Sequence, residues 1–179
     1  WETLAGELSG RLAARGHDVL VYDDLSRGHA AAVPVGVPLV RGDIREMKVA
    51  QELAADADWI VNFAAESHVD RSTKARAGEF IDTNVYGAYV MLEATRQVNR
   101  GARFLQVGTD EVYGDVPFPE FPNEQAMLAP SSPYSAAKAG ADHIALAFHR
   151  THQMDVIVSR CTNNYGPNQY PEKVIPVFV

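Results

Sequence analysis

The chain has 179 residues, 46% of them hydrophobic and 22% charged, which is enough apolar material for one sizeable core but not for two domains. Its net charge of -7 at neutral pH repels phosphate backbones and argues against a nucleic-acid partner. No apolar run reaches the roughly 20 residues of a membrane span, and the single cysteine, Cys161, excludes an intrachain disulfide and fits a reducing, cytoplasmic compartment.

The first part of the chain alternates helical and strand patterns. Residues 4–15 are predicted to form a helix that ends at Gly16, a residue suited to a helix C-terminus. A further helix is predicted over 45–55, and short buried strands over 18–23, 38–43 and 58–63. The last of these strands is continuously apolar, which is typical of a strand covered on both faces in a parallel sheet.

The second part of the chain continues the same alternation. Helices are predicted over 79–99 and 134–151, and strands over 103–107 and 155–159. Strands separated by helices imply crossover connections, so the sequence predicts an α/β fold with a doubly wound parallel sheet. Ligands of such sheets bind beyond the carboxyl ends of the strands, which is where the candidate functional residues are found.

A candidate cofactor residue, Asp23, ends the first predicted strand. A carboxylate at this place can accept hydrogen bonds from an adenosine ribose and repels a 2′-phosphate, which favours NAD over NADP. Arg27 lies close by and weakens this preference, and a solvated turn at Asp23 is the structural alternative. Asp43 and Ile44 follow the next strand and are expected near the adenine.

Two further features bear on a dinucleotide site. The small residues of Phe63-Ala-Ala-Glu-Ser67 follow the third strand and would let the backbone approach a cofactor, although a tight turn has the same composition. A Gly-rich phosphate loop should precede the first helix, but the chain has Trp1-Glu-Thr-Leu4 there. We therefore expect a central first strand and this loop to lie upstream of residue 1, in a chain truncated at both ends.

A candidate base is formed by Tyr134 and Lys138, which are four residues apart in a predicted helix and share one face. A phenol has an unperturbed pKa near ~10, and a neighbouring ammonium stabilises the phenolate and lowers that pKa. Such a base can take a hydroxyl proton while hydride leaves the same carbon. The structural alternative is a tyrosine and a lysine exposed on a helix surface.

A pair of acids in Thr109-Asp110-Glu111 follows the fourth strand. Two adjacent carboxyl groups can be divided into an acid and a base by different environments, whereas two acids in a loop are otherwise ordinary solvated charge. Because this pair follows a strand and Tyr134 opens the next helix, we expect both to converge on one cleft.

Asparagines follow the fifth strand in Asn163-Asn-Tyr-Gly-Pro167. Asparagine side chains donate and accept hydrogen bonds, so they suit sugars and amides, although the same residues form simple turns. His149 and His152 lie three apart with no third ligand in view, so no metal site is expected.

Five long motifs, in order, resemble the dTDP-glucose 4,6-dehydratases. These are NAD-dependent sugar-nucleotide enzymes with a Rossmann-like fold of the extended short-chain dehydrogenase/reductase type. The resemblance runs from about residue 15 to the end of the chain. The motifs are NFAAESHVDRS (62–72), TDEVYG (109–114), APSSPYSAAK (129–138), NNYGP (163–167) and YPEKVIP (170–176).

The resemblance implies a reaction in three steps. Tyr134 would deprotonate the sugar C4 hydroxyl as NAD takes the C4 hydride, with Lys138 lowering the pKa of the tyrosine. Glu111 would then remove the C5 proton and Asp110 would protonate the leaving C6 hydroxyl. The hydride would return to C6. Thr109 would hydrogen-bond the C4 oxygen.

The resemblance also implies binding residues and a domain organisation. Residues 1–179 would be a partial NAD-binding domain, with a truncated substrate-binding region starting over 168–179, and the full-length protein would be a homodimer. The implied cofactor residues are Asp23, Asp43, Ile44, Ala64, Ala65, Ser67, Thr83, Tyr134, Lys138 and Asn164. The implied substrate residues are Thr109, Asn163, Lys173, Val174, Ile175, Pro176 and Val177.

Three alternatives remain open at this point. A 4-epimerase and a UDP-glucuronate decarboxylase have the same fold, but an epimerase expels no water and a decarboxylase substrate has no C6 hydroxyl, so Asp110 separates a dehydratase from both. A non-catalytic nucleotide-sugar or NAD-binding module needs no acid–base set. The resemblance favours dTDP-glucose as the substrate. Without the Gly-rich loop, these 179 residues are expected to bind NAD poorly.

Overall fold

Parallel strand pairs connected by helices are the framework of the computed structural model, which describes residues 2–67, 72–73 and 77–166. The chain divides into two compact units, Trp1–Ile44 with Asn163–Val179, and Arg45–Thr162. Every strand pair in the described part of the chain is parallel, as the alternation of strands and helices predicts. None of the described helices combines the length and hydropathy needed to cross a bilayer.

The first unit contains a two-stranded parallel sheet. Its elements are α1 (Glu2–Ala14), β1 (Val21–Asp23), the 3-10 turn η1 (Ala30–Ala32) and β2 (Leu39–Arg41). Val21 pairs with Leu39 and Asp23 with Arg41. Gly16 has a φ of +84°, so the expected stop after the first helix is confirmed, with a residue that tolerates the left-handed conformation.

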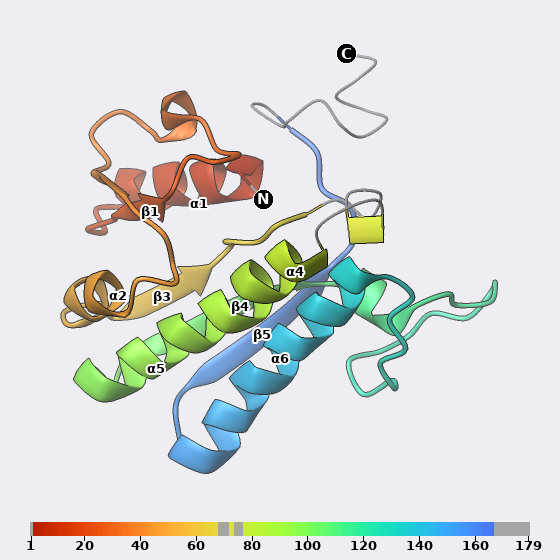
Figure 1. The fold of residues 1–179 in the computed structure, drawn as a ribbon. Coiled ribbons are helices and arrows are strands. Elements are labelled where there is room, and N and C mark those ends of the chain that lie inside the picture. The colour runs from red at the N-terminus through yellow and green to blue at the C-terminus, as the bar shows by residue number, and fades with distance from the viewer. Residues whose placement is uncertain (1, 68–71, 74–76, 167–179) are drawn as a thin grey trace. The chain divides into compact units, whose positions relative to one another are not determined.

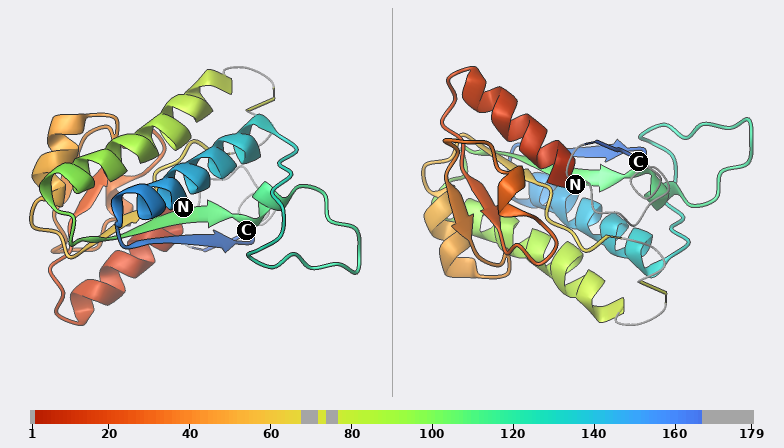
Figure 2. Two further views of the ribbon diagram at one scale, coloured as in Figure 1. Left: turned by 90° about the horizontal axis from the view of Figure 1, so that it is seen from below. Right: turned by 90° about the horizontal axis from the view of Figure 1, so that it is seen from above.

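The second unit contains a three-stranded sheet in the order β3–β4–β5. Figures 1 and 2 show α5 and α6 side by side along one face of this sheet. The elements are α2 (Met47–Ala54), β3 (Trp59–Asn62), α4 (Ala77–Phe80), the π-helix η2 (Ile81–Gly87), α5 (Ala88–Val98), β4 (Arg103–Thr109), the 3-10 helix η3 (Asp110–Tyr113), α6 (Pro133–His152) and β5 (Val156–Cys161).

The expected single helix over 79–99 is in fact three consecutive pieces, α4, η2 and α5. The widened π turn in the middle contains Asn84, whose buried side chain bonds the backbone of Glu66 on both sides: Oδ1 accepts from the amide at 2.8 Å and Nδ2 donates to the carbonyl at 3.0 Å. The π segment therefore holds the chain that follows β3.

Helix α6 begins where the sequence predicts, and local hydrogen bonds explain why. The Ser132 hydroxyl accepts from the amide of Ser135, the Ser135 hydroxyl accepts from the amide of Ser132, and Pro133 occupies the first turn. The helix ends at Gln153, which is left-handed with a φ of 59°. This start places Tyr134 in the first turn.

The long segment between η3 and α6 returns to its own starting point. The Ala129 amide donates to the Val112 carbonyl over 3.0 Å. Gly114 has a φ of +72°, and a Cβ there would lie 2.0 Å from the Ala129 carbonyl oxygen, so only glycine fits. The closure brings the start of α6 back to η3.

The core of the second unit lies between its sheet and α5 and α6. Phe80, Leu92 and Phe104 are at most 1% exposed, and α6 contributes mainly small side chains such as Ala141 and Ala145. β4 is the best buried strand, whereas Trp59 on β3 and Ile157 on β5 remain 53% and 43% exposed. Full cover on both faces, expected from the apolar run at 58–63, is therefore not found at Trp59.

Candidate active site

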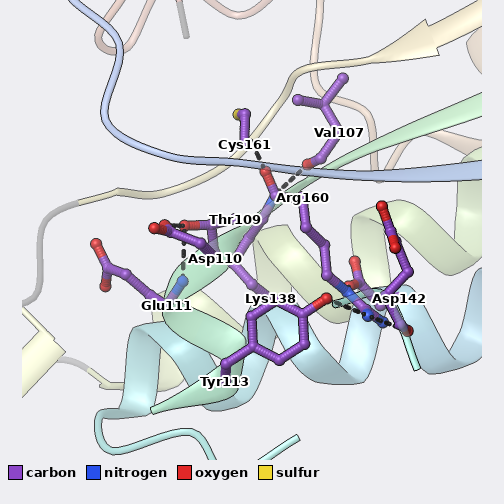
Figure 3. A network of polar contacts seen from close by, with 11 residues as sticks. Val107, Thr109, Asp110, Glu111, Tyr113, Lys138, Asp142, Arg160 and Cys161 are labelled. Atoms are coloured by element: carbon purple, nitrogen blue, oxygen red, sulfur yellow. Dashed lines mark hydrogen bonds and ion pairs between the residues drawn. The ribbon is translucent and has the colours of Figure 1, made fainter. Parts of the chain in front are cut away.

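The acid pair lies at the carboxyl end of β4, in the first turn of η3. Thr109 ends the strand and caps the short helix: its Oγ1 accepts from the Glu111 amide at 3.3 Å and donates to Oδ1 of Asp110 at 3.4 Å. Thr109 is buried, while both acids are half-buried. The cap fixes the backbone from which the two carboxyl groups project (Figure 3).

Lys138 is buried against the same strand. Its side chain is 1% exposed, and Nζ donates to the Val107 carbonyl oxygen at 2.6 Å. Burial lowers the pKa of Lys138 to about 8, and the electrostatic effect of the nearby Asp142 carboxyl and Cys161 side chain opposes this shift. The expectation of a surface tyrosine–lysine pair, which was the structural alternative, is therefore wrong for this lysine.

Tyr134 lies one turn before Lys138 on α6 and is 5% exposed. Its ring meets the Phe80 ring edge-on, with the centroids 6.2 Å apart and the planes at 77°. Phe80, Tyr134 and Ala137 form one buried cluster, against which Val85 packs. The tyrosine ring is thus held by α4 and η2 as well as by its own helix.

The helix of Tyr134 and the helix of the acid pair are in direct contact. Val112 and Tyr113 of η3 form a buried cluster with Ala139 of α6. The segment between Gly114 and Ala129 returns to η3 before α6 begins. The first turn of α6 therefore lies at the carboxyl end of β4, where the acid pair is found. The structure therefore brings η3 and α6 together, on one end of one unit.

A second polar group, which sequence reasoning missed, joins the same elements. Arg160 of β5 donates from Nε to Oδ2 of Asp142 at 2.9 Å and from Nη1 to the Tyr113 hydroxyl at 3.1 Å. Asp142 is fully buried, and burial raises its pKa while the hydrogen bond from Arg160 opposes that rise. The spacing of Lys138 and Asp142, four apart on one helix, is the only local signal for this network.

The expected cofactor residues of the second unit follow β3 and lie on η2. Ala64, Ala65 and Ser67 are half-buried, and so is Thr83 on the π-helix. The turn is shaped by the buried Asn62, whose Oδ1 accepts from the Ala64 amide at 3.2 Å and whose Nδ2 donates to Oε1 of Gln106 at 2.9 Å.

The remaining expected residues belong to the first unit. Asp23 is half-buried at the end of β1, and its Oδ1 accepts from the Leu25 amide at 2.7 Å, so this carboxylate also orders the turn that follows. The Asp43 carbonyl accepts from the Tyr22 hydroxyl at 2.5 Å, and Ile44 is 7% exposed.

The expected positions after β5 are one cofactor residue, Asn164, and the substrate residues that begin at Asn163. Asn163 and Asn164 are exposed. Lys173, Val174, Ile175, Pro176 and Val177, with the substrate-binding region expected over 168–179, lie outside the described residues.

The chain is similar to curated sugar-nucleotide dehydratases. Residues 11–179 match the family model described as GDP-mannose 4,6 dehydratase. The dTDP-glucose 4,6-dehydratase of Streptomyces niveus is 47% identical over 182 residues, which cover 98% of this chain and 52% of the relative. That of Streptomyces antibioticus is 51% identical over 143 residues, covering 80% and 42%. The chain thus spans about half the length of these curated relatives.

Solved structures agree with this likeness. A dTDP-glucose 4,6-dehydratase from Streptomyces venezuelae, crystallised with NAD, superposes with a TM-score of 0.88 at 42% identity, over 98% of this chain and 56% of the other. A UDP-glucose 4-epimerase from Thermus thermophilus, also with NAD, superposes with a TM-score of 0.87 at 29% identity, over 96% and 56%. The expected α/β, Rossmann-like fold is confirmed.

Proposed function

Because this chain belongs to the GDP-mannose 4,6 dehydratase family, we propose that the full-length protein is an NAD-dependent lyase that dehydrates a nucleotide-activated hexose. The substrate is dTDP-glucose and the product is dTDP-4-keto-6-deoxyglucose, a choice of nucleotide supported by relatives that are 47% and 51% identical. The observation that carries the proposal is the contact between η3, which bears Asp110 and Glu111, and α6, which bears Tyr134 and Lys138.

Each unit, taken by itself, has residues after its strands that suit one part of a dinucleotide. Asp23 presents a half-buried carboxylate at the carboxyl end of a parallel strand, where a ribose hydroxyl can donate to it. Ala64 and Ala65 are small, and the Asn62 and Asn84 side chains hold the backbone of this turn in place. NAD held by these residues would supply hydride-transfer chemistry, as acceptor at C4 and as donor, in its reduced form, at C6.

The chain's own residues handle the protons of the first step. Tyr134 accepts the proton of the sugar C4 hydroxyl. The Lys138 ammonium, fixed by the Val107 carbonyl, stabilises the phenolate form of Tyr134 from one helical turn away. Since a buried site screens charge poorly, this cation acts more strongly here than it would at a surface.

The acid pair handles the second step. The 4-ketone acidifies the C5 hydrogen, Glu111 accepts that proton, and Asp110 gives a proton to the C6 hydroxyl, which leaves as water. Thr109 holds Oδ1 of Asp110 through its hydroxyl and fixes the Glu111 amide, so one residue orients both acids.

The acid Asp110 favours dehydration over the alternatives of the same fold. A 4-epimerase needs only the oxidation and its reversal, and a decarboxylase has no C6 hydroxyl to protonate. The superposition on a UDP-glucose 4-epimerase reflects the fold that these enzymes share. A non-catalytic binding module has no use for a buried lysine beside a tyrosine and two acids.

A homodimer working in the cytoplasm completes the proposal. Apolar side chains on η2 and α5 are exposed, with Ile81 at 49%, Tyr86 at 51% and Tyr89 at 38%. The rings of Tyr86 and Tyr89 lie 5.9 Å apart, and Tyr89 meets Phe148 of α6 at 6.2 Å. Covering this aromatic row by a second copy of the same helices would remove apolar surface from water.

The experiment is a turnover assay of the full-length protein against dTDP-, UDP-, CDP- and GDP-glucose in deuterated water. We expect dTDP-glucose to lose one water, with deuterium at C5 and hydride from C4 at C6. A product that keeps its C6 hydroxyl contradicts dehydration, and preferential use of another nucleotide contradicts the substrate.

A further inference from the structure

Arg160 of β5 is bonded to three other segments of the second unit, and we call this set of contacts the junction. Its Nε donates to Asp142 of α6, and its Nη1 donates both to the Tyr113 hydroxyl of η3 and to the Glu124 carbonyl at 3.3 Å. Its guanidinium also lies over the Tyr113 ring, 5.3 Å from the centroid. One side chain thus ties β5, α6, η3 and the segment that returns from η3 to α6.

The end of the junction at Asp142 is buried and closely packed. Asp142 is 0% exposed, one turn beyond Lys138 on the same helix. Its carboxylate lies against β4, where a Cβ at Gly108 would come within 3.0 Å of Oδ1 and 2.4 Å of the Ser159 carbonyl, so a residue without a side chain leaves it room. Among the described residues, Oδ1 has no hydrogen-bond partner, so Arg160 is the group that compensates this buried carboxylate by a hydrogen bond, with the charge of Lys138 one turn away.

At its other end, the junction contacts Tyr113 of η3, the short helix that also contains the acid pair. η3 has four residues, Asp110 and Glu111 at its start and Tyr113 at its end. A helix this short has little stability of its own, so its orientation depends on what its side chains contact. Figure 3 shows Tyr113 reaching from η3 toward Arg160 and Asp142, while Asp110 and Glu111 project from the other end.

We propose that Arg160 is a positioning residue, which holds Asp142 and Tyr113 together and thereby fixes the acid pair against the helix of Tyr134 and Lys138. The inference rests on the proposed dehydration, because the acids act only in the elimination of water. Arg160 touches neither acid, and it acts through Tyr113. Elimination therefore depends on Arg160 more than C4 oxidation does, since the Tyr134–Lys138 pair sits on α6 itself.

A purely structural ion pair is the simpler alternative, and it makes a different prediction. It would lower stability when broken, and any loss of activity would affect oxidation and elimination alike. A positioning role separates the two steps, because small misplacements of a catalytic group are costly in rate.

The test uses Tyr113→Phe in the full-length protein, which removes one hydroxyl and leaves the ring over Arg160. Thr151→Val is the control, since it removes one exposed hydroxyl near the C-terminal end of α6. C4 oxidation is followed by the transient absorbance of NADH and elimination by formation of the 4-keto-6-deoxy sugar. Hydrogen exchange of 110–114 is measured in the same proteins.

We expect Tyr113→Phe to slow elimination by roughly tenfold, with C4 oxidation and KM within about twofold of wild type. Exchange of 110–114 should be faster in this variant and unchanged in Thr151→Val. Arg160→Lys, which keeps a positive charge but lacks the forked geometry, should show the same separation of steps.

Two outcomes overturn the inference in distinguishable ways. Equal slowing of both steps, or unchanged exchange of 110–114, in Tyr113→Phe refutes the positioning role while wild-type dehydration stands. A wild-type protein that forms no 4-keto-6-deoxy sugar refutes the proposed function. The positioning role of Arg160 is then refuted as well, because there is no elimination step for it to support.

Discussion

The Nζ of Lys138 donates to the backbone carbonyl of Val107 over 2.6 Å, inside the contact between α6 and β4. The acceptor, Val107, lies two residues before Thr109, which ends β4 and is followed directly by the acid pair. The burial of Lys138 also destabilises its ammonium, so this lysine loses its charge at mildly alkaline pH, unlike an exposed lysine.

The first prediction concerns the pH dependence of activity. Burial lowers the pKa of Lys138 to about 8, so the ammonium is lost as the pH rises through this value. The phenolate of Tyr134 then loses its neighbouring cation, and we expect kcat of the full-length protein to fall on the alkaline side with an apparent pKa near 8. A kcat that stays level up to pH 10 would contradict this.

The same group makes stability depend on pH. The pKa of Lys138 in the folded protein lies below the ordinary value of 10.5, so the unfolded chain binds more protons between about pH 8 and 10.5. The contribution of Lys138 to the free energy of unfolding therefore rises with pH through this window, by up to about 3 kcal/mol at 1.36 kcal/mol per pKa unit. Urea unfolding from pH 7 to 10, with Lys138→Met as the control that lacks this rise, measures it.

The second prediction separates the two chemical steps at Asp110. Asp110→Asn keeps the shape of the side chain but removes the proton that the C6 hydroxyl needs on leaving. We expect elimination to fall by about 10²- to 10⁴-fold while C4 oxidation persists. Asp115→Asn, the same change at an exposed residue just past η3, should leave both steps unchanged. Undiminished water loss in Asp110→Asn would remove the assigned role.

The third prediction compares a buried ion pair with an exposed one. Arg160→Ala leaves the buried carboxylate of Asp142 without its hydrogen-bonded cation, so we expect a loss of about 3–5 kcal/mol in the free energy of unfolding. Arg11→Ala breaks the Arg11–Glu7 pair, whose side chains are 72% and 60% exposed, and should cost no more than about 1 kcal/mol. Denaturant titration of both variants gives the comparison, and equal losses would contradict it.

The fourth prediction concerns the closure between η3 and α6. Gly114→Ala places a Cβ against the Ala129 carbonyl at a left-handed φ, so we expect a loss of at least about 1 kcal/mol and faster proteolysis of the segment after Gly114. Gly78→Ala, in a helix with open space around it, should be neutral or slightly stabilising. A Gly114→Ala variant as stable as wild type would show that the closure is not needed.

Local sequence patterns predicted most elements but not their details. The start of α6 is set by Ser132, Pro133 and Ser135, three consecutive or neighbouring residues, so it could be predicted from the chain alone. The π turn at Ile81–Gly87 could not, because an apolar period near 3.6 residues does not distinguish one widened turn in a long helix. Asn84, inside that turn, was missed for the same reason.

The sequence by itself determined the parallel α/β arrangement and the positions of Asp110, Glu111, Tyr134 and Lys138 at strand ends and on one helix face. The arrangement and these positions depend on hydrophobic periodicity and on residues a few positions apart, both of which can be read from the sequence. Only the tertiary structure decided that Lys138 is buried, and that Arg160 joins Asp142 and Tyr113, which are 18 and 47 residues away along the chain. Such contacts arise when separate strands and helices pack, and the desolvation that shifts the pKa values of Lys138 and Asp142 exists only once that packing has formed.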